Sequence, residues 1–194
     1  TNEVGIFEMK DKGLVEVANP SAAFLSERPA NATGSVVAAA IEGSRPMLIE
    51  IQALVTPSKL NFPTRKTTGV DFNRTAIVIA VLEKQLGLKL SFQDIFVNAA
   101  GGVEAGGPAM DLPIALAIAS SLKNKPVNHE TAVVGEVGLA GEVRSVSQID
   151  QRVKEAEKLG FKEIIISQGN VKGLGKTKIK IQAVSTVKEA LIKL

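Results

Sequence analysis

Alternating hydrophobic and polar positions dominate the N-terminal third of the chain and predict a β-rich structure there. The polar turn at residues 11–13 separates two alternating stretches, which predicts a hairpin. Asn19 before Pro20 is typical of a helix start, because an N-cap side chain accepts backbone amides and proline suits the first turn. The predicted elements are an N-terminal hairpin over residues 3–18, a short helix over 21–28 and the two strands of a second hairpin over 35–42 and 47–56.

The pattern then changes to that of a long helix. Asp71 is a typical N-cap residue and Gly87 a typical residue just after a helix, so the helix is expected to lie between them. Every residue from 76 to 82 is apolar, which predicts that both faces of the middle of this helix are covered. Residues 57–70, which precede it, are polar and contain two prolines, and we expect them to form a basic loop.

Beyond residue 90, strand-like and helix-like stretches alternate, as is typical of an α/β arrangement. The expected elements are a strand over 95–99, a glycine-rich loop over 101–108, a helix over 109–122, strands over 131–139 and 142–146, a helix over 148–159, strands over 163–167 and 178–184, and a helix over 186–194. No proline-rich or serine-rich linker divides the chain. We therefore expect one α/β domain over residues 1–194, with an α+β-like front half, an α/β back half over 71–194, and a mixed sheet packed with helices.

The helix predicted over 148–159 is amphipathic. Ile149, Val153 and Ala156 fall on one stripe, which is expected to face the core. The charged residues of the same helix, with Arg152 and Lys154 among them, are expected on a solvated outer face.

Composition excludes several kinds of chemistry. At 45% hydrophobic and 22% charged residues, the 194-residue chain has enough apolar surface to form a core. Without cysteine it has no disulfide, and with His129 as its one histidine, expected in an exposed loop, it lacks the usual ligands of a zinc site. No apolar run is long enough to cross a bilayer and no secretory signal is visible, so we expect a cytoplasmic protein without membrane contact. Because Thr1 stands where a start methionine is expected, we also expect the chain to be cut from a longer protein.

The net charge of +3 is unevenly distributed. Residues 57–90 hold six cations against two acids, a net of +4, and residues 169–194 hold six lysines against one glutamate, a net of +5. Such basic regions permit contact with nucleic acid. Arg65 and Lys66 in the basic loop, and Arg74 after it, are the first candidates for contact with DNA or with another subunit.

Arg74 is expected in the first turn of its helix, where a cation opposes the helix dipole. A carboxylate or phosphate partner, from this chain, another subunit or a ligand, would offset that cost. The alternative is that Arg74 pairs with Asp71 beside it.

Two glycine-rich segments resemble functional motifs but depart from them. In residues 169–177, five residues separate Gly169 from Gly175 where a P-loop has four, and a strand pattern follows where a helix is needed. We expect a flexible basic turn there and no ATP site. The loop over 101–108 leads into a helix, as an oxyanion-holding loop of a hydrolase does, but Ala109 at the helix start has no nucleophilic atom. A turn that requires glycine is the simpler interpretation.

The whole chain resembles the C-terminal Lon-protease-like domain of the bacterial RadA (Sms) family of DNA repair proteins. The stretches that carry the resemblance are residues 1–9, 19–21 with 24–25, 42–46, 51–55, 69–74 with 80–84, 135–144 and 152–161. Proteolytic Lon domains use a serine–lysine dyad, and the resemblance places the serine position at Ala109 and the lysine position at Asp150. It therefore implies a Lon-like fold that does not cut peptides.

The resemblance further implies a hexameric, ATP-driven branch-migration helicase in DNA repair and recombination, in which this domain closes the ring and contacts single-stranded or branched DNA. Besides Arg65, Lys66 and Arg74, it makes Arg45 and Arg144 candidates for DNA binding or the subunit interface. ATP, Mg and Zn are expected in preceding domains, with no cofactor or metal in this chain, and RecA recombinase is a possible partner of the full-length protein.

Two other interpretations stay open. One is an active peptidase with a different nucleophile, Ser120 or Ser147, and Lys154 as the base. The other is a related Lon-like domain fused to a chelatase-type ATPase, which fits the fold but not residues 69–74.

Overall fold

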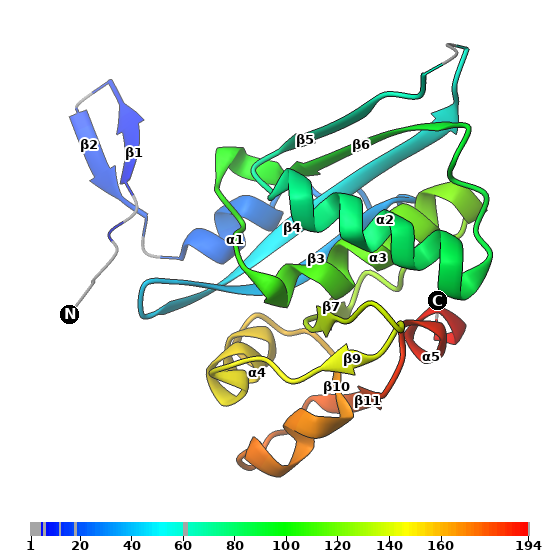
Figure 1. Cartoon of the computed structure of the whole chain (residues 1–194). Coiled ribbons are helices and arrows are strands. Elements are labelled where there is room, and N and C mark those ends of the chain that lie inside the picture. The colour runs from blue at the N-terminus through cyan, green and yellow to red at the C-terminus, as the bar shows by residue number, and fades with distance from the viewer. Residues whose placement is uncertain (1–4, 6, 12, 18, 60–61, 194) are drawn as a thin grey trace.

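A seven-stranded mixed sheet, in the order β11–β10–β7–β3–β4–β6–β5, runs through the middle of the molecule (Figure 1). The computed structural model describes residues 5, 7–11, 13–17, 19–59 and 62–193. The strands are β1 (Phe7–Lys10), β2 (Gly13–Glu16), β3 (Ser35–Glu42), β4 (Arg45–Pro57), β5 (Arg65–Thr68), β6 (Gln93–Ala99), β7 (Thr131–Val133), β8 (Glu136–Val137), β9 (Val143–Arg144), β10 (Glu163–Ser167) and β11 (Lys180–Val184). The helices are α1 (Pro20–Leu25), α2 (Phe72–Leu86), α3 (Asp111–Lys123), α4 (Ile149–Lys158) and α5 (Val187–Ile192), and 3-10 turns cover η1 (Ala100–Gly102), η2 (Pro108–Met110) and η3 (Gln168–Gly173).

Strand directions divide the sheet as the sequence predicts. β3, β4 and β6 are antiparallel neighbours, whereas β7, β10 and β11 are parallel to one another and β7 is parallel to β3. The α/β fold with a mixed sheet is thus confirmed, with a front part that is antiparallel apart from β5, which is parallel to β6, and a parallel back part.

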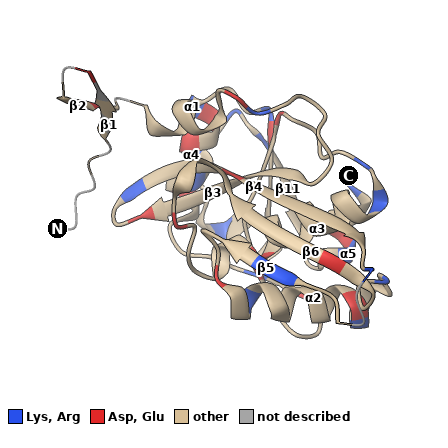
Figure 2. Ribbon diagram, turned by 90° about the horizontal axis from the view of Figure 1, so that it is seen from above, with Lys and Arg blue, Asp and Glu red and all other residues tan. Residues whose placement is uncertain are grey.

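Helices cover the two faces of the sheet unequally. Figure 2 shows α1 and α4 on one side of β3 and β4 and α2 on the other, and α3 packs on β3 and β4 beside α2. β3 is buried from Ser35 to Ala40, on both faces, because both are covered there. Over the second half of β4, by contrast, buried and exposed residues alternate, so the end of the sheet formed by β4, β6 and β5 is covered on one face only.

α3 is buried from Asp111 to Ser121, as an almost wholly apolar helix must be. Its two C-terminal serines satisfy backbone groups of neighbouring segments. Ser120 Oγ accepts from the amide of Gly34 at 2.9 Å and donates to the carbonyl of Lys125 at 2.6 Å, and Ser121 Oγ accepts from the amide of Val55 at 2.9 Å.

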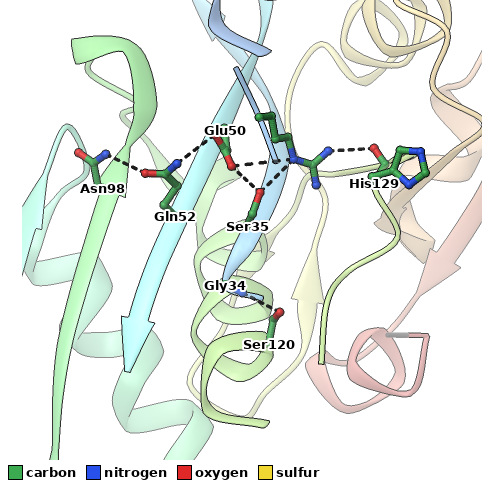
Figure 3. Close-up of polar contacts among 8 residues, drawn as sticks. Gly34, Ser35, Glu50, Gln52, Asn98, Ser120 and His129 are labelled. Atoms are coloured by element: carbon green, nitrogen blue, oxygen red, sulfur yellow. Dashed lines mark hydrogen bonds and ion pairs between the residues drawn. The ribbon is translucent and has the colours of Figure 1, made fainter. Parts of the chain in front are cut away.

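A buried polar chain crosses β3 and β4 (Figure 3). Arg28 Nε donates to Ser35 Oγ at 2.9 Å, and Ser35 Oγ donates to Glu50 Oε1 at 2.5 Å. Glu50 Oε2 accepts from Gln52, and Arg28 Nη1 donates to the carbonyl of His129. Burial lowers the pKa of Arg28, while the nearby Glu50 carboxylate opposes that shift. His129 itself is exposed, as expected.

The predicted residues at the start of α1 and at the two ends of α2 are confirmed. Asn19 Oδ1 accepts from the amide of Ala22, Asp71 Oδ1 accepts from the amide of Arg74, and Gly87 ends α2 in the left-handed conformation. The N-terminal hairpin forms a separate two-stranded sheet away from the main sheet (Figure 1). Of its predicted span, residues 3, 4, 6, 12 and 18 lie outside the described residues.

Several predictions about elements are wrong. The single strand expected over 131–139 is two short strands, β7 in the main sheet and β8 in a two-stranded sheet with β9. Residues 65–68 of the basic loop form β5, because a four-residue polar strand is stabilised by pairing along β6. The middle of α2 is not covered on both faces within one chain, since Ala76, Ile77 and Ala80 are exposed. Arg152 is buried rather than solvated, because its guanidinium donates to the carbonyls of Ser147 and Ala39.

Candidate functional site

The first turns of α2 and α3 are joined by a bidentate ion pair. Arg74 Nε donates to Asp111 Oδ1 at 2.9 Å and Arg74 Nη2 donates to Asp111 Oδ2 at 2.5 Å. The Asp111 side chain is 2% exposed and that of Arg74 34%. Hydrogen bonding to Asp111 raises the pKa of Arg74, so the guanidinium stays charged. The partner of Arg74 is thus a carboxylate of this chain, while Asp71 binds only its backbone amide.

Asp111 also holds the segment after β7. Its Oδ2 accepts from the amide of Val137 in β8 at 3.1 Å. The buried carboxylate therefore receives three hydrogen bonds from two other segments of the chain, which offsets the cost of removing it from water. The ion pair fixes α2, α3 and β8 relative to one another.

The glycine-rich loop before α3 packs against the turn between β5 and α2. Gly69 has a φ of +69°, its carbonyl accepts from the amide of Ala105 at 2.6 Å, and a Cβ there would lie 2.4 Å from the carbonyl oxygen of Val103. Glycine is needed at position 69 for both reasons. Within the loop, Gly101 and Gly107 also have positive φ, which agrees with a turn that requires glycine.

Ala109, which the resemblance places at the position of the dyad serine, is buried and offers no reactive atom. Its carbonyl accepts from the amide of Gly135 at 3.1 Å. The amides that follow are also in use, since Met110 donates to Gly107 and Leu112 donates to Gly135. The backbone amides at this helix start therefore donate to carbonyls of the same chain, whereas in a hydrolase amides at this place would donate to an oxyanion.

Asp150, which the resemblance places at the position of the dyad lysine, lies in the first turn of α4. Its Oδ2 pairs with Lys154 Nζ at 2.5 Å and its Oδ1 accepts from the amide of Gly175 at 3.0 Å. The hydrogen bond from Lys154, helped by that from Gly175, lowers the pKa of Asp150. Position 150 thus carries a hydrogen-bond acceptor rather than a catalytic base, and this acceptor holds the loop that contains Gly175.

The residues of the peptidase interpretation are not arranged for catalysis. Ser120 Oγ is fully buried with two hydrogen bonds to the backbone. Lys154 is exposed, and its Nζ is ion-paired with Asp150 rather than placed beside a serine hydroxyl. Ser147 is exposed, and its carbonyl accepts from Arg152.

The predicted basic residues differ in what they contact. Arg65 donates to the carbonyls of Thr64, Gln93 and Leu90, so its guanidinium braces the loops around β5 and β6. Lys66 is exposed and lines a hollow of about 290 Å³ with Leu54 and Phe96 on the uncovered sheet face.

The remaining two basic candidates lie at turns. Arg144 is exposed and pairs with Glu142 at 2.6 Å, and its hydrogen bond lowers the pKa of Glu142. Arg45 begins β4 and is half-buried. The structure does not bring these residues together with Lys66 into one cluster. Their contact with DNA or a second subunit stays a prediction.

Among the described residues, no three His, Cys, Asp or Glu side chains gather closely enough to hold a metal ion. In the same part of the chain, no helix combines the length and apolarity needed to span a membrane.

Residues 49–170 match the family model described as subunit ChlI of Mg-chelatase. The chain belongs to this family. It is 54% identical over 192 residues to DNA repair protein RadA of Halalkalibacterium halodurans, 53% to that of Bacillus subtilis, and 51% over 194 residues to that of Streptococcus pneumoniae. These similarities cover 98–100% of the chain, and they confirm the resemblance to RadA found in the sequence. The chain spans less than half the length of these relatives, between 42% and 46%.

The sequence alone did not reveal the role of Asp111. It stands 37 positions after Arg74. The sequence feature that could have indicated its role is a single carboxylate at the start of an otherwise apolar helix. The contact between Asp150 and Gly175 has no local signal, since it joins residues 25 positions apart.

Replacing Arg74 with alanine should leave Asp111 buried and short of two donors. We expect the free energy of unfolding to fall by roughly 2–3 kcal/mol, the cost of an unsatisfied buried charged group. Urea unfolding followed by circular dichroism measures this. Arg144→Ala, which breaks an exposed pair of the same kind, is the matched control and should leave the midpoint nearly unchanged. An equal fall in the free energy of unfolding in both variants would contradict the idea that the buried ion pair stabilises the fold more than the exposed one.

Proposed function

We propose that this chain is the non-proteolytic, ring-forming and DNA-contacting part of a RadA-type DNA repair protein. Identity of 50–54% to DNA repair protein RadA along the whole chain is the observation that carries the proposal. In the whole protein the expected activity is ATP-driven branch migration during recombination, in a hexamer that acts on single-stranded or branched DNA. In this proposal ATP, Mg and Zn belong to its other segments, and RecA recombinase is a partner of the full-length protein.

The proposed absence of proteolysis rests on the two dyad positions. Ala109 has no nucleophile, and the carboxylate of Asp150 is engaged by Lys154 and Gly175. A serine–lysine mechanism needs a hydroxyl and a neutral amine in contact. Neither position supplies its part.

The purified chain should not hydrolyse casein or a fluorogenic peptide above the buffer blank. The reason is that Ala109 and Asp150 supply neither a hydroxyl nor an amine at the two proposed dyad positions. An Ala109→Ser variant serves to detect a contaminating protease, because contamination would give the same rate in both preparations. Turnover by the native chain that is lost in Ser147→Ala would contradict the proposal.

The proposed ring contact rests on the outer stripe of α2. Phe72 is 51% exposed and Ile77 44%, and Ala76 and Ala80 are exposed between and beyond them. The opposite side of the helix, with Val78 and Leu82, is buried in the core. A helix that is apolar all round is normally covered all round. We therefore propose that a second copy of the chain covers this stripe.

Ile77→Glu should prevent self-association, because it places a carboxylate at the centre of the proposed contact. We expect the native chain to have a solution mass several times 20.4 kDa and the variant a mass of 20.4 kDa, measured by light scattering after gel filtration. Gln151→Glu, at an exposed position of α4, is the control and should leave the assembly intact. A native chain that stays monomeric, or an assembly unaffected by Ile77→Glu, would refute this contact.

The proposed DNA contact rests on charge and multiplicity. One copy carries only +3, but six copies in a ring would carry +18, enough to attract a polyanion. Lys66 is the best placed of the predicted residues, since it is exposed and has no ion-pair partner among the described residues. Arg45 and Arg144 are the next candidates for DNA contact. Arg65 and Arg74 are less suitable, because Arg65 donates to backbone carbonyls and Arg74 donates to Asp111.

The chain should bind single-stranded and branched DNA with an affinity that falls as salt rises. Each phosphate contact should contribute about 0.7–0.9 to the slope of log K against log salt concentration. Fluorescence anisotropy between about 50 and about 300 mM salt measures this slope. Lys66→Gln should flatten it, whereas Lys66→Arg should keep it. Absence of binding at the lowest salt would refute DNA contact by this chain.

A further inference from the structure

Three lysines without acidic partners lie in the segment between β10 and β11. This segment, residues 168–179, contains Lys172, Lys176 and Lys178 and no Asp or Glu, and is named here the cationic loop. All three lysines are exposed, and in the described part of the chain none of their ammonium groups has a hydrogen-bond or ion-pair partner. In contrast, Lys154 and Lys180 nearby are each paired with a carboxylate.

The cationic loop is fastened at its start. η3 begins after Ser167, whose Oγ accepts from the amide of Gly169 at 3.2 Å. The side chain of Asn170 is buried and bonds both the amide and the carbonyl of Val146, each at 2.9 Å. The predicted flexible turn is thus a segment with a 3-10 helix and defined anchors.

Two carboxylates of α4 fasten the second half of the loop. Asp150 Oδ1 accepts from the amide of Gly175 at 3.0 Å. Glu157 accepts from the hydroxyl of Thr177 at 2.5 Å and from the amide of Lys178 at 3.3 Å. These acids bind backbone amides and a hydroxyl, so they shape the loop without neutralising its lysines.

We propose that the cationic loop is a contact site for the phosphate backbone of DNA, and that Asp150 is the positioning residue that holds it. The proposal rests on the DNA contact proposed above and gives it a location. Lysine ammonium groups are hydrated point charges that suit phosphates, and the loop offers no aromatic side chain to stack on a base. The contact is therefore independent of base sequence.

The cationic loop and Lys66 are at opposite ends of the sheet. β11 follows the loop and is one edge strand, while Lys66 is on β5, the other edge strand. Figure 1 shows the same separation, with the loop in orange at the bottom and β5 at the top. Variants of the two sites therefore report on different surfaces.

The first test removes the charges. In the triple variant Lys172→Gln, Lys176→Gln and Lys178→Gln, we expect weaker binding and a salt slope reduced by about 2–3, corresponding to three lost phosphate contacts. The corresponding triple change to arginine keeps the charges and should keep the slope. Unchanged affinity and slope in the glutamine variant would overturn the proposal.

The second test separates loop position from charge. Asp150→Ala removes a negative charge and frees Lys154, so Coulomb attraction alone would strengthen DNA binding. If Asp150 positions the loop, binding should weaken, and Asp150→Asn, whose carbonyl can still accept from Gly175, should largely retain it. Equal or tighter binding by Asp150→Ala would refute the positioning role.

The outcomes distinguish this proposal from the proposed function. If the native chain does not bind DNA at all, the proposed function fails with it. If Lys66→Gln weakens DNA binding while the triple glutamine variant does not, the proposed function stands and the cationic loop is excluded. If the triple variant loses binding to poly-glutamate while its DNA binding is unchanged, the loop is a site for acidic protein and the proposal is wrong.

Discussion

The buried ion pair between Arg74 and Asp111 is the contact on which the centre of this molecule depends. It joins the first turns of α2 and α3, and through Val137 it also joins β8. A carboxylate as buried as Asp111 is tolerable only with a full set of donors, so the three segments must keep one arrangement. The ion pair also explains a cation in the first turn of α2, where the helix dipole alone would disfavour it.

Most of the fold follows from local signals in the sequence. The caps of α1 and α2, the strand β3 and the helix α3 were predicted because their causes lie within a few residues of each element. β5 was missed because its polar residues are ordered by β6, whose paired residues lie 30 positions further along the chain. The burial of Arg152 was missed because it depends on the carbonyl of Ala39, from the opposite part of the chain.

Candidate site residues could be named from the sequence, but their long-range contacts could not. Ala109 and Asp150 followed from resemblance to a family with a known dyad, whereas the contact of Asp150 with Gly175 appears only in three dimensions. The same holds for Arg65, which the sequence presents as a surface cation and the structure presents as a donor to three carbonyls. Charge counts along a chain do not show which cations are already in use.

The use of position 150 as an anchor has a consequence for any attempt to build a serine–lysine dyad into this chain. A lysine restored there would place a second ammonium beside Lys154 and would leave the amide of Gly175 without its acceptor. A serine restored at position 109 would enter a buried helix start whose next amides are occupied. Substitution of both residues would therefore recreate a dyad motif without recreating its surroundings.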